Sequence, residues 1–327
     1  MKYRTLGKTG YKVSEIAYGS WSLGADWGDV SEEQAFSTLA TLPKAGINFI
    51  DTADVYGDGR SEKLIAKFGQ TETAPMHIAT KAGRRLNPHL ARGYTEENLT
   101  KFVERSLKNL ETNCLDLLQL HCPPTQVFYM PETFRALDNL VKAGKIRYYG
   151  VSVEKVEEAL KAIEFPNVST VQIIFNMFRQ RPMELFFQEA KKRNIGIIVR
   201  VPLASGLLTG KFDSNSKFAE NDHRLYNRQG AAFDVGETFA GVDFETGLTA
   251  VKKLKKIVPA GYTMPQFALK WILMQDAVST VIVGGKTAEQ VMENSQASEL
   301  PALSDQLMKK VADIYESSIK SQVHYRW

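Results

Sequence analysis

Cysteine is nearly absent from this chain of 327 residues, which contains only Cys114 and Cys122. Two cysteines provide no disulfide framework. A chain of this length buries about three-quarters of the surface that it exposes when unfolded, so its core needs no disulfide or metal to hold it together. We therefore expect a reduced, cytoplasmic protein.

Long apolar runs and clusters of like charge are also missing. The most apolar stretch, residues 195–208, is interrupted by Arg200 and Pro202 and falls short of the ~18 apolar residues of a membrane span. The N-terminus lacks the apolar region of a signal peptide. The net charge is +4, with Lys and Arg scattered along the chain, whereas nucleic-acid binding needs a basic stripe. We expect no membrane and no nucleic-acid partner, and the mild positive charge suits a small anionic ligand.

Short apolar runs rich in β-forming residues alternate with amphipathic helical stretches along the chain. The eight runs are residues 15–18, 48–51, 77–80, 115–120, 148–152, 171–175, 195–201 and 280–283. Ser31, Thr95, Thr263 and Thr287 stand at positions typical of helix N-caps. This alternation predicts an α/β protein with a (β/α)8 TIM barrel, formed as one domain by residues 1–327. An open, doubly wound sheet is the alternative.

Three segments depart from the repeating pattern. Residues 3–13, with Gly7 and Gly10 in the middle, predict an N-terminal β-hairpin that closes the bottom of the barrel. Residues 203–241 form a long connection after the seventh barrel strand, with little periodicity, and connections of this length are usually functional. A C-terminal extra helix is expected from Ser304 onward.

Ionisable residues follow three consecutive predicted strands. Asp51 ends the second strand, Tyr56 lies in the next loop, and Lys81 and His121 directly follow the third and fourth strands. Neighbouring strand ends converge at one face of a barrel, so these side chains are expected to meet. Each alone has an ordinary structural explanation, such as a turn, a solvated loop or a hydrogen-bonded core. Their coincidence is what indicates a site.

These four residues form a proton-donating set. A tyrosine hydroxyl has a pKa of ~10, and a lysine ammonium beside it is expected to lower that pKa. Asp51 would keep Lys81 charged, and His121 would donate a hydrogen bond to a substrate carbonyl. The set lacks a reductant, so the chemistry requires a cofactor. No metal is expected, because the adjacent His121 and Cys122 do not have the spacing of zinc ligands.

The chain contains neither of the two common nucleotide-binding loop motifs, the dinucleotide fingerprint and the P-loop. Residues 57–62 have Glu62 where a dinucleotide fingerprint needs its third glycine. Residues 206–212 have the wrong glycine spacing for a P-loop and end in Phe212. Any nucleotide must therefore be held by other means.

The sequence resembles the aldo-keto reductase superfamily across nearly its whole length, and most of all its bacterial branch with a long cofactor loop. The motifs that carry the resemblance are Asp51-Thr52-Ala53-Asp54-Val55-Tyr56-Gly57, Ala79-Thr80-Lys81, Leu115-Asp116-Leu117 before His121, Gly144-Lys145-Ile146-Arg147, Gly150-Val151-Ser152, Ser205-Gly206-Leu207-Leu208-Thr209-Gly210-Lys211, and Gln290 with Glu293-Asn294.

This resemblance implies an NADP(H)-dependent oxidoreductase that reduces an aldehyde or ketone, sugars among the candidates, to an alcohol. It implies the catalytic tetrad Asp51, Tyr56, Lys81 and His121, with Tyr56 as general acid and His121 orienting the carbonyl. It also implies these cofactor-binding residues: Gly19, Ser20, Trp21, Asp51, Ser152, Gln172, Arg200, Pro202, Leu203, Ser205, Gly206, Leu208, Lys211, Gly284, Gly285, Lys286, Gln290, Glu293 and Asn294.

The chain departs from the family pattern at three cofactor positions. Val153 replaces the usual asparagine, and Arg200 replaces an aromatic residue that stacks on the nicotinamide ring. The alternative for Arg200 is a salt-bridged barrel residue. Gln290 stands where members often place a second cation for the 2′-phosphate, which leaves Lys286 as the cation there. A moderate preference for NADP(H) over NAD(H) follows.

Aromatic residues in the strand-end loops are the candidates for the substrate pocket, whose expected residues are Trp21, Trp27, Tyr56, His121 and Phe128, with Tyr129, Tyr226 and Trp327 as further aromatics. Trp271 is expected in the core, and no catalytic role is expected for Cys122. Two other functions stay open: a nicotinamide-nucleotide-sensing regulatory subunit with little turnover, and a Schiff-base lyase that uses Lys81. The sequence leaves the substrate, the reaction direction and the oligomeric state open.

Overall fold

A closed barrel of parallel strands forms the centre of the molecule. The computed structural model describes residues 1–24, 30–72 and 74–327. Within these residues the barrel strands are β3 (Ile16–Gly19), β4 (Phe49–Asp51), β5 (His77–Ala82), β6 (Leu115–His121), β7 (Ile146–Ser152), β8 (Val168–Ile174), β9 (Gly196–Arg200) and β10 (Val278–Gly284). Each strand pairs with the next along the chain, and β10 closes the barrel against β3. The predicted (β/α)8 barrel is confirmed, and the open sheet is wrong.

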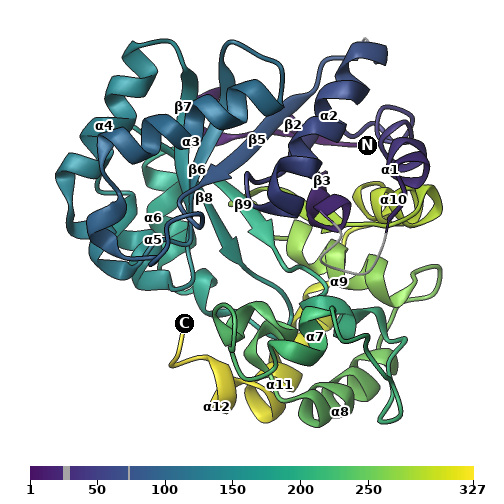
Figure 1. The fold of residues 1–327 in the computed structure, drawn as a ribbon. Helices are drawn as coiled ribbons and strands as arrows, with labels where there is room; N and C mark the ends of the chain where they lie inside the picture. The colour runs from purple at the N-terminus through teal and green to yellow at the C-terminus, as the bar shows by residue number, and fades with distance from the viewer. Residues whose placement is uncertain (25–29, 73) are drawn as a thin grey trace.

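Helices surround this barrel (Figure 1). They are α1 (Glu32–Leu39), α2 (Arg60–Thr71), α3 (Glu96–Asn109), α4 (Pro131–Lys142), α5 (Val156–Ala162), α6 (Phe186–Lys192), α9 (Met264–Leu273) and α10 (Ala288–Ser295). The predicted caps are confirmed: the side chains of Ser31, Thr95, Thr263 and Thr287 each accept a backbone N–H of the first helical turn. None of the helices in the described part of the chain is long and apolar enough to cross a membrane.

The N-terminal hairpin closes one end of the barrel, as expected. It consists of β1 (Tyr3–Thr5) and β2 (Lys12–Ser14), which pair in antiparallel register. Leu6 and Val13 are fully buried against residues that point into the barrel from six of its strands: Ala17, Phe49, Ala79, Leu117, Ile198 and Ile282. Gly7 has a φ of +49°, and a Cβ there would lie 2.0 Å from the amide nitrogen of Gly196. The hairpin therefore fills the N-terminal mouth of the barrel and leaves chemistry to the opposite end.

The connection between β9 and β10 has more regular structure than expected. Residues 203–241 contain η7 (Ala204–Thr209), α7 (His223–Tyr226), η8 (Val235–Glu237) and η9 (Phe239–Gly241), and α8 (Phe244–Lys255) follows. The predicted C-terminal helix is α11 (Asp305–Ser318), followed by α12 (Lys320–Val323). Helix α11 packs against α8. Figure 1 shows α7, α8, α11 and α12 gathered on one side of the barrel. The short elements η7, α7, η8 and η9 were not predicted, because each is too brief to show a repeating apolar face.

Leu6→Ala is expected to lower the free energy of unfolding by about 2–5 kcal/mol, because it leaves a cavity among the packed side chains at the barrel mouth. Urea denaturation measures this loss. Leu185→Ala removes the same atoms from a side chain that is 48% exposed and is expected to change the free energy far less. Equal losses for the two variants would contradict the plugging role of Leu6.

Candidate active site

The predicted tetrad assembles at the C-terminal end of the barrel. Asp51 ends β4, and Tyr56 begins η3 (Tyr56–Gly59). Lys81 lies within β5 and His121 ends β6, so both belong to the strands that they were expected to follow. The Lys81 ammonium donates to the Asp51 carboxylate, to the Thr52 carbonyl at 2.9 Å and to the Tyr56 hydroxyl at 3.2 Å. The four side chains therefore meet as predicted from their strand ends.

Two amides hold the other side of the Asp51 carboxylate. Gln119 Nε2 donates to Asp51 Oδ1 at 3.0 Å, and Gln172 Nε2 donates to the same oxygen at 2.7 Å. Both glutamines are buried, as is Asp51. Gln119 was not predicted, although its position two residues before His121 places its side chain on the same face of the strand. These amides orient Asp51 toward Lys81.

Lys81 is held as a cation. Burial alone would lower its pKa, but the Asp51 carboxylate and the neighbouring Tyr56 raise the pKa above its ordinary value. Three acceptors already surround its ammonium, which is buried. A Schiff base requires a neutral amine that reaches the substrate. The geometry of Lys81 is therefore unfavourable for the lyase alternative.

Tyr56 keeps its proton at neutral pH. Burial raises the pKa of its hydroxyl, and the attraction of the Lys81 ammonium opposes this rise without cancelling it. The expected effect of Lys81 on the Tyr56 pKa is present, but the net pKa is raised because burial, which was not considered, has the larger effect. A phenol that is still protonated is the form that donates a proton.

His121 is a neutral imidazole beside Tyr56. Burial, followed by the positive charges of Arg84, Lys81 and Arg200, lowers its pKa well below the ordinary value. Its ring meets the Tyr56 ring edge-on, with centroids 6.0 Å apart. Its Nδ1 atom is buried and has no hydrogen-bond partner among the residues that the structure describes. A neutral histidine can donate one hydrogen bond, and the His121 side chain lines a cavity that a ligand can enter.

A cavity of about 430 Å³ lies over the tetrad. Asp51, Tyr56 and His121 line it, together with all the expected cofactor residues except Leu208. Those lining residues are Gly19, Ser20, Trp21, Asp51, Ser152, Gln172, Arg200, Pro202, Leu203, Ser205, Gly206, Lys211, Gly284, Gly285, Lys286, Gln290, Glu293 and Asn294. Phe212, Arg224 and Glu237 also line the cavity, and the sequence analysis had not singled out any of them as lining residues. The volume falls within the range of small-molecule sites.

The donors around this cavity fit a nicotinamide nucleotide. Lys211 and Lys286 supply positive charge for phosphates, and Arg224, which pairs with Asp222, lies on the same wall. Ser205 and Gly206 have positive φ values of 53° and 97°, which curl the loop along the cavity wall. Loops after the seventh and eighth strands form the usual phosphate site of such barrels, and these residues belong to those loops or follow them.

Several aromatic residues lie elsewhere than expected. Phe128 is fully buried in the hydrophobic core, so its assignment to the substrate pocket does not fit this structure. Leu208 is likewise buried in the core and is not among the residues that line the cavity. Trp327 is buried against Arg179, and Tyr129 is exposed beside Lys161.

The remaining aromatic positions divide in the same way. Trp271 lies in the core, as expected. Tyr226 is 40% exposed and meets Phe233 edge-on without lining the cavity. Trp27 lies outside the described residues. Trp21 lines the cavity and stacks beside Tyr56, with ring centroids 6.0 Å apart.

A buried ionic cluster adjoins the tetrad and was not predicted. Arg84 pairs with Glu154 and Glu237, and Arg200 pairs with the same two carboxylates. Arg200 is salt-bridged and also lines the cavity, so its ion pairs do not exclude a role in cofactor binding. Arg84 and Glu154 each lie two residues beyond a barrel strand, a position that strand-end counting would have found. Glu237 comes from the long connection and carried no signal in the sequence.

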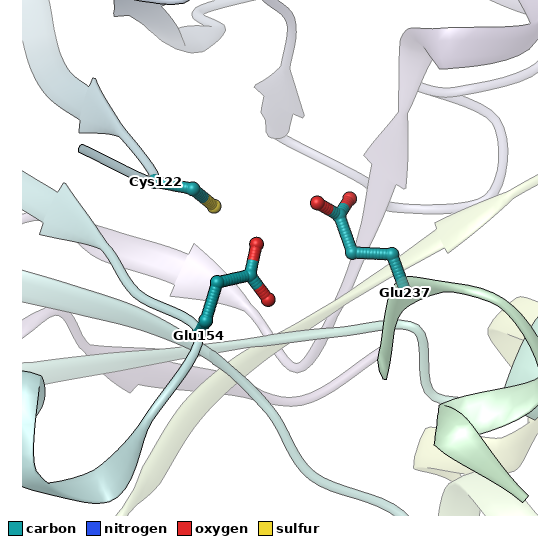
Figure 2. A group of neighbouring side chains, drawn as sticks. All are labelled: Cys122, Glu154 and Glu237. Atoms are coloured by element: carbon teal, nitrogen blue, oxygen red, sulfur yellow. The ribbon is translucent and has the colours of Figure 1, made fainter. Parts of the chain in front are cut away.

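Figure 2 shows Cys122, Glu154 and Glu237 pointing toward one another. One ligand atom from each lies within 4.8 Å of the others, a spacing compatible with a metal ion. Both carboxylates are already paired with guanidinium groups, and burial raises the pKa of the Cys122 thiol to about 12. A metal would have to displace two arginines and a proton, so the cluster is better described as an ion-pair network.

Comparisons with known proteins agree with this geometry. The sequence profile of the Aldo/keto reductase family matches residues 15–316. The aldo-keto reductase YhdN of Bacillus subtilis is 29% identical over 99% of this chain and 96% of its own length. A probable voltage-gated potassium channel subunit beta of Arabidopsis thaliana is 30% identical over the full length of both chains.

A solved structure shares the architecture as well. The glycerol dehydrogenase of Gluconobacter oxydans superposes with a TM-score of 0.80 and 27% identity, covering 97% of this chain and 96% of that one. The family profile, the full-length relatives and the barrel with its tetrad lead to one conclusion: this chain belongs to the aldo/keto reductase family, whose fold is that of an oxidoreductase.

Proposed function

We propose that this protein is an NADP(H)-dependent reductase of aldehydes or ketones. The observation that carries the proposal is a protonated Tyr56 hydroxyl 3.2 Å from the Lys81 ammonium, beside the neutral His121. These groups lie in a cavity that Lys211 and Lys286 also line. A proton donor, a carbonyl-orienting group and phosphate-binding cations are what carbonyl reduction by a nicotinamide nucleotide requires.

The chain's own residues supply the proton and the orientation. When bound, NADPH supplies a hydride to the carbonyl carbon. Tyr56 donates its proton to the carbonyl oxygen, and the Lys81 ammonium stabilises the phenolate that remains. Asp51 keeps Lys81 charged and in place, and His121 donates a hydrogen bond that positions the carbonyl oxygen between itself and Tyr56. After the reaction, Tyr56 takes up a proton from solvent.

The cofactor is proposed to lie along the cavity that passes between the barrel end and the long connection. Ser152 and Gln172 would meet the nicotinamide carboxamide, and residues 203–211 would cover the diphosphate. Lys286 stands next to Thr287, the cap of α10, whose N-terminus favours an anion. This placement assigns the 2′-phosphate to Lys286 and its neighbours.

The substrate is proposed to be a small polar carbonyl compound, with sugar-like hydroxylated molecules as the leading class. Apart from the tetrad, Trp21 is the one expected pocket aromatic that lines the cavity in the described part of the chain, and it stacks beside Tyr56. Arg200 and Glu237 add charged groups to the cavity wall. The similarity to a glycerol dehydrogenase supports a hydroxylated substrate. A panel of short aldehydes, sugars, quinones and steroids, followed by NADPH absorbance, distinguishes these classes.

A nucleotide-sensing subunit is the second candidate, because a potassium channel subunit beta is among the full-length relatives. Such a protein binds NADPH tightly but turns it over slowly or not at all. Multiple turnovers on any carbonyl of the panel would favour the enzyme. Tight binding without turnover would favour the sensor.

Tyr56→Phe is expected to keep the fold and the affinity for NADPH while carbonyl reduction falls by about 10²–10⁴-fold, the usual contribution of a general acid. The substitution removes the hydroxyl that Lys81 contacts and leaves the ring beside Trp21. Single-turnover oxidation of bound NADPH measures the chemical step. A rate near that of the unmodified protein would remove Tyr56 from the mechanism.

Lys286→Ala is expected to weaken NADPH binding by roughly 10- to 150-fold and to leave NADH binding almost unchanged, since one charge-assisted contact to the 2′-phosphate is lost. Quenching of tryptophan fluorescence measures both affinities. Lys310→Ala, on the exposed surface of α11, is the matched control and is expected to change neither. Equal weakening of NADPH and NADH by Lys286→Ala would show that Lys286 does not recognise the phosphate.

Residues 203–241 are expected to become protected from hydrogen exchange when NADPH binds. Eight of these residues line the cavity, namely Leu203, Ser205, Gly206, Thr209, Lys211, Phe212, Arg224 and Glu237. A segment that orders over a ligand loses its open states. Exchange with and without NADPH tests this, with α4 (Pro131–Lys142) as an internal reference. Unchanged protection of the segment would contradict its role as a cover.

A further inference from the structure

Arg200 is a buried cation held rigidly in the wall of the cavity. It ends β9 and is 6% exposed. Its Nη2 donates to Glu154 Oε2 at 2.9 Å and to the Val153 carbonyl at 3.0 Å, while its Nη1 lies 3.3 Å from Glu237 Oε2. These contacts leave the guanidinium little freedom to rotate. Its charge therefore acts from a fixed position.

Short contacts connect this guanidinium to the reaction centre. Its Nη2 donates to the sulfur of Cys122, the residue after His121, at 3.5 Å. That sulfur is in turn 3.5 Å from the Ser152 hydroxyl, which donates to Gln172 Oε1 at 3.4 Å. Ser152, Gln172, Arg200 and His121 all line one cavity. A ring that passes a hydride to a carbonyl held by His121 therefore lies near Arg200.

Arg200 also has an unused donor. Its Nε atom is buried and has no hydrogen-bond partner among the residues that the structure describes. A buried N–H without an acceptor is costly. Because this atom is shielded from the cavity, Arg200 acts on a molecule there through its charge and not through a hydrogen bond from Nε.

Three cationic side chains near the reaction centre, Arg84, Lys81 and Arg200, act on His121 although each is paired with a carboxylate. After burial, the strongest influences on the pKa of His121 are Arg84, Lys81 and Arg200, and all three lower it. The carboxylates of Glu154 and Glu237 pair with the arginines. Even so, a cation at His121 is disfavoured. A ligand that becomes positively charged in the same place meets the same repulsion.

We propose that Arg200 determines which redox state of the nicotinamide ring this site prefers, by binding the neutral reduced ring more tightly than the cationic oxidised ring. The inference rests on the proposed function, since it requires the ring to lie in this cavity. NADPH and NADP⁺ carry the same phosphates and differ in the ring, so their ratio of affinities isolates the effect of charge beside the ring. The fold-change depends on separation and on local dielectric. Such a site favours carbonyl reduction and release of the oxidised cofactor.

The test measures the dissociation constants of NADPH and NADP⁺ by calorimetry for the full-length protein, at pH 8.5. Burial raises the pKa of Glu154 to about 7, against the pull of Arg200, so this carboxyl is ionised under these conditions. We expect NADPH to bind at least about tenfold more tightly than NADP⁺, which corresponds to about 1.4 kcal/mol. Arg200→Gln is expected to reduce this preference about tenfold, and Arg200→Lys to retain most of it.

A second variant changes the preference in the opposite direction and keeps Arg200. Glu154→Gln removes a negative charge 2.9 Å from the guanidinium, so the preference for NADPH is expected to rise. Arg200→Gln removes a partner from both Glu154 and Glu237 and can fail to fold for that reason. In that case Glu154→Gln still tests the proposal. Lys211→Met is the control: its side chain lines the cavity without belonging to the ionic cluster, so both affinities are expected to weaken with their ratio unchanged.

Four results are decisive. An unchanged ratio in folded Arg200→Gln, or an unchanged or reduced preference for NADPH in Glu154→Gln, would overturn the role of Arg200. Equal affinities for the two nucleotides in the unmodified protein would overturn it as well, while leaving the proposed NADP(H) function standing. Failure of the unmodified protein to bind either nucleotide would instead overturn the proposed function.

Discussion

The ion pair between Lys81 and Asp51 is the interaction on which the rest of the site depends. Both groups are buried, and an unpaired charge in such a place would be strongly destabilising. Gln119 and Gln172 satisfy the remaining carboxylate oxygen, while Thr52 and Tyr56 accept the other protons of the ammonium. Every partner is supplied by a barrel strand or the loop that follows it. The chemistry of Tyr56 is thereby built on the rigid part of the molecule.

The barrel divides its two ends between stability and chemistry. The hairpin fills the N-terminal mouth with Leu6 and Val13, so that end is an ordinary apolar core. At the other end, polar side chains of β4, β5, β6 and β8 replace the apolar ones, and the long connection covers what they leave open. Burial there is incomplete by necessity, because a substrate and a cofactor have to enter. The groups at the bottom of this opening are themselves buried, and that burial keeps Tyr56 protonated and His121 neutral.

The ionic cluster of Arg84, Glu154, Arg200 and Glu237 contributes both to holding the structure together and to the electrostatics of the site. Arg84, Glu154 and Arg200 come from the rim of the barrel, and Glu237 comes from the long connection, so the pairs attach that connection to the barrel beside the tetrad. Buried ion pairs contribute little net stability compared with apolar packing. Their position beside the reaction centre suggests a role other than stability, namely the electrostatic field that they produce at His121 and in the cavity. Burial lowers the pKa of His121, and the charges of Arg84 and Arg200, together with Lys81, lower it further.

The sequence by itself determined the order of strands and helices, the caps and the hairpin, because each depends on residues close together in the chain. It also indicated the tetrad, because the ends of neighbouring parallel strands converge in any barrel. An apolar run, a threonine at the start of a helix, or an ionisable residue at a strand end has the same meaning in most barrels. What the tertiary structure decided are the quantities that depend on neighbours from distant segments. Lys81 was expected to lower the pKa of Tyr56, but burial outweighs it. Phe128 had the aromatic character of a pocket residue, yet its loop packs inward.

Glu237 is the clearest example of this limit. Nothing in residues 203–241 distinguishes its carboxylate from the other acidic residues of that segment, and its partners Arg84 and Arg200 lie far from it in the chain. Only the folded path of the connection brings the three together and removes water from around them. Local sequence patterns report on bonds and periodicity, whereas the energy of a charge depends on all the groups within several ångströms and on how much solvent they exclude. That information exists only once the chain has folded.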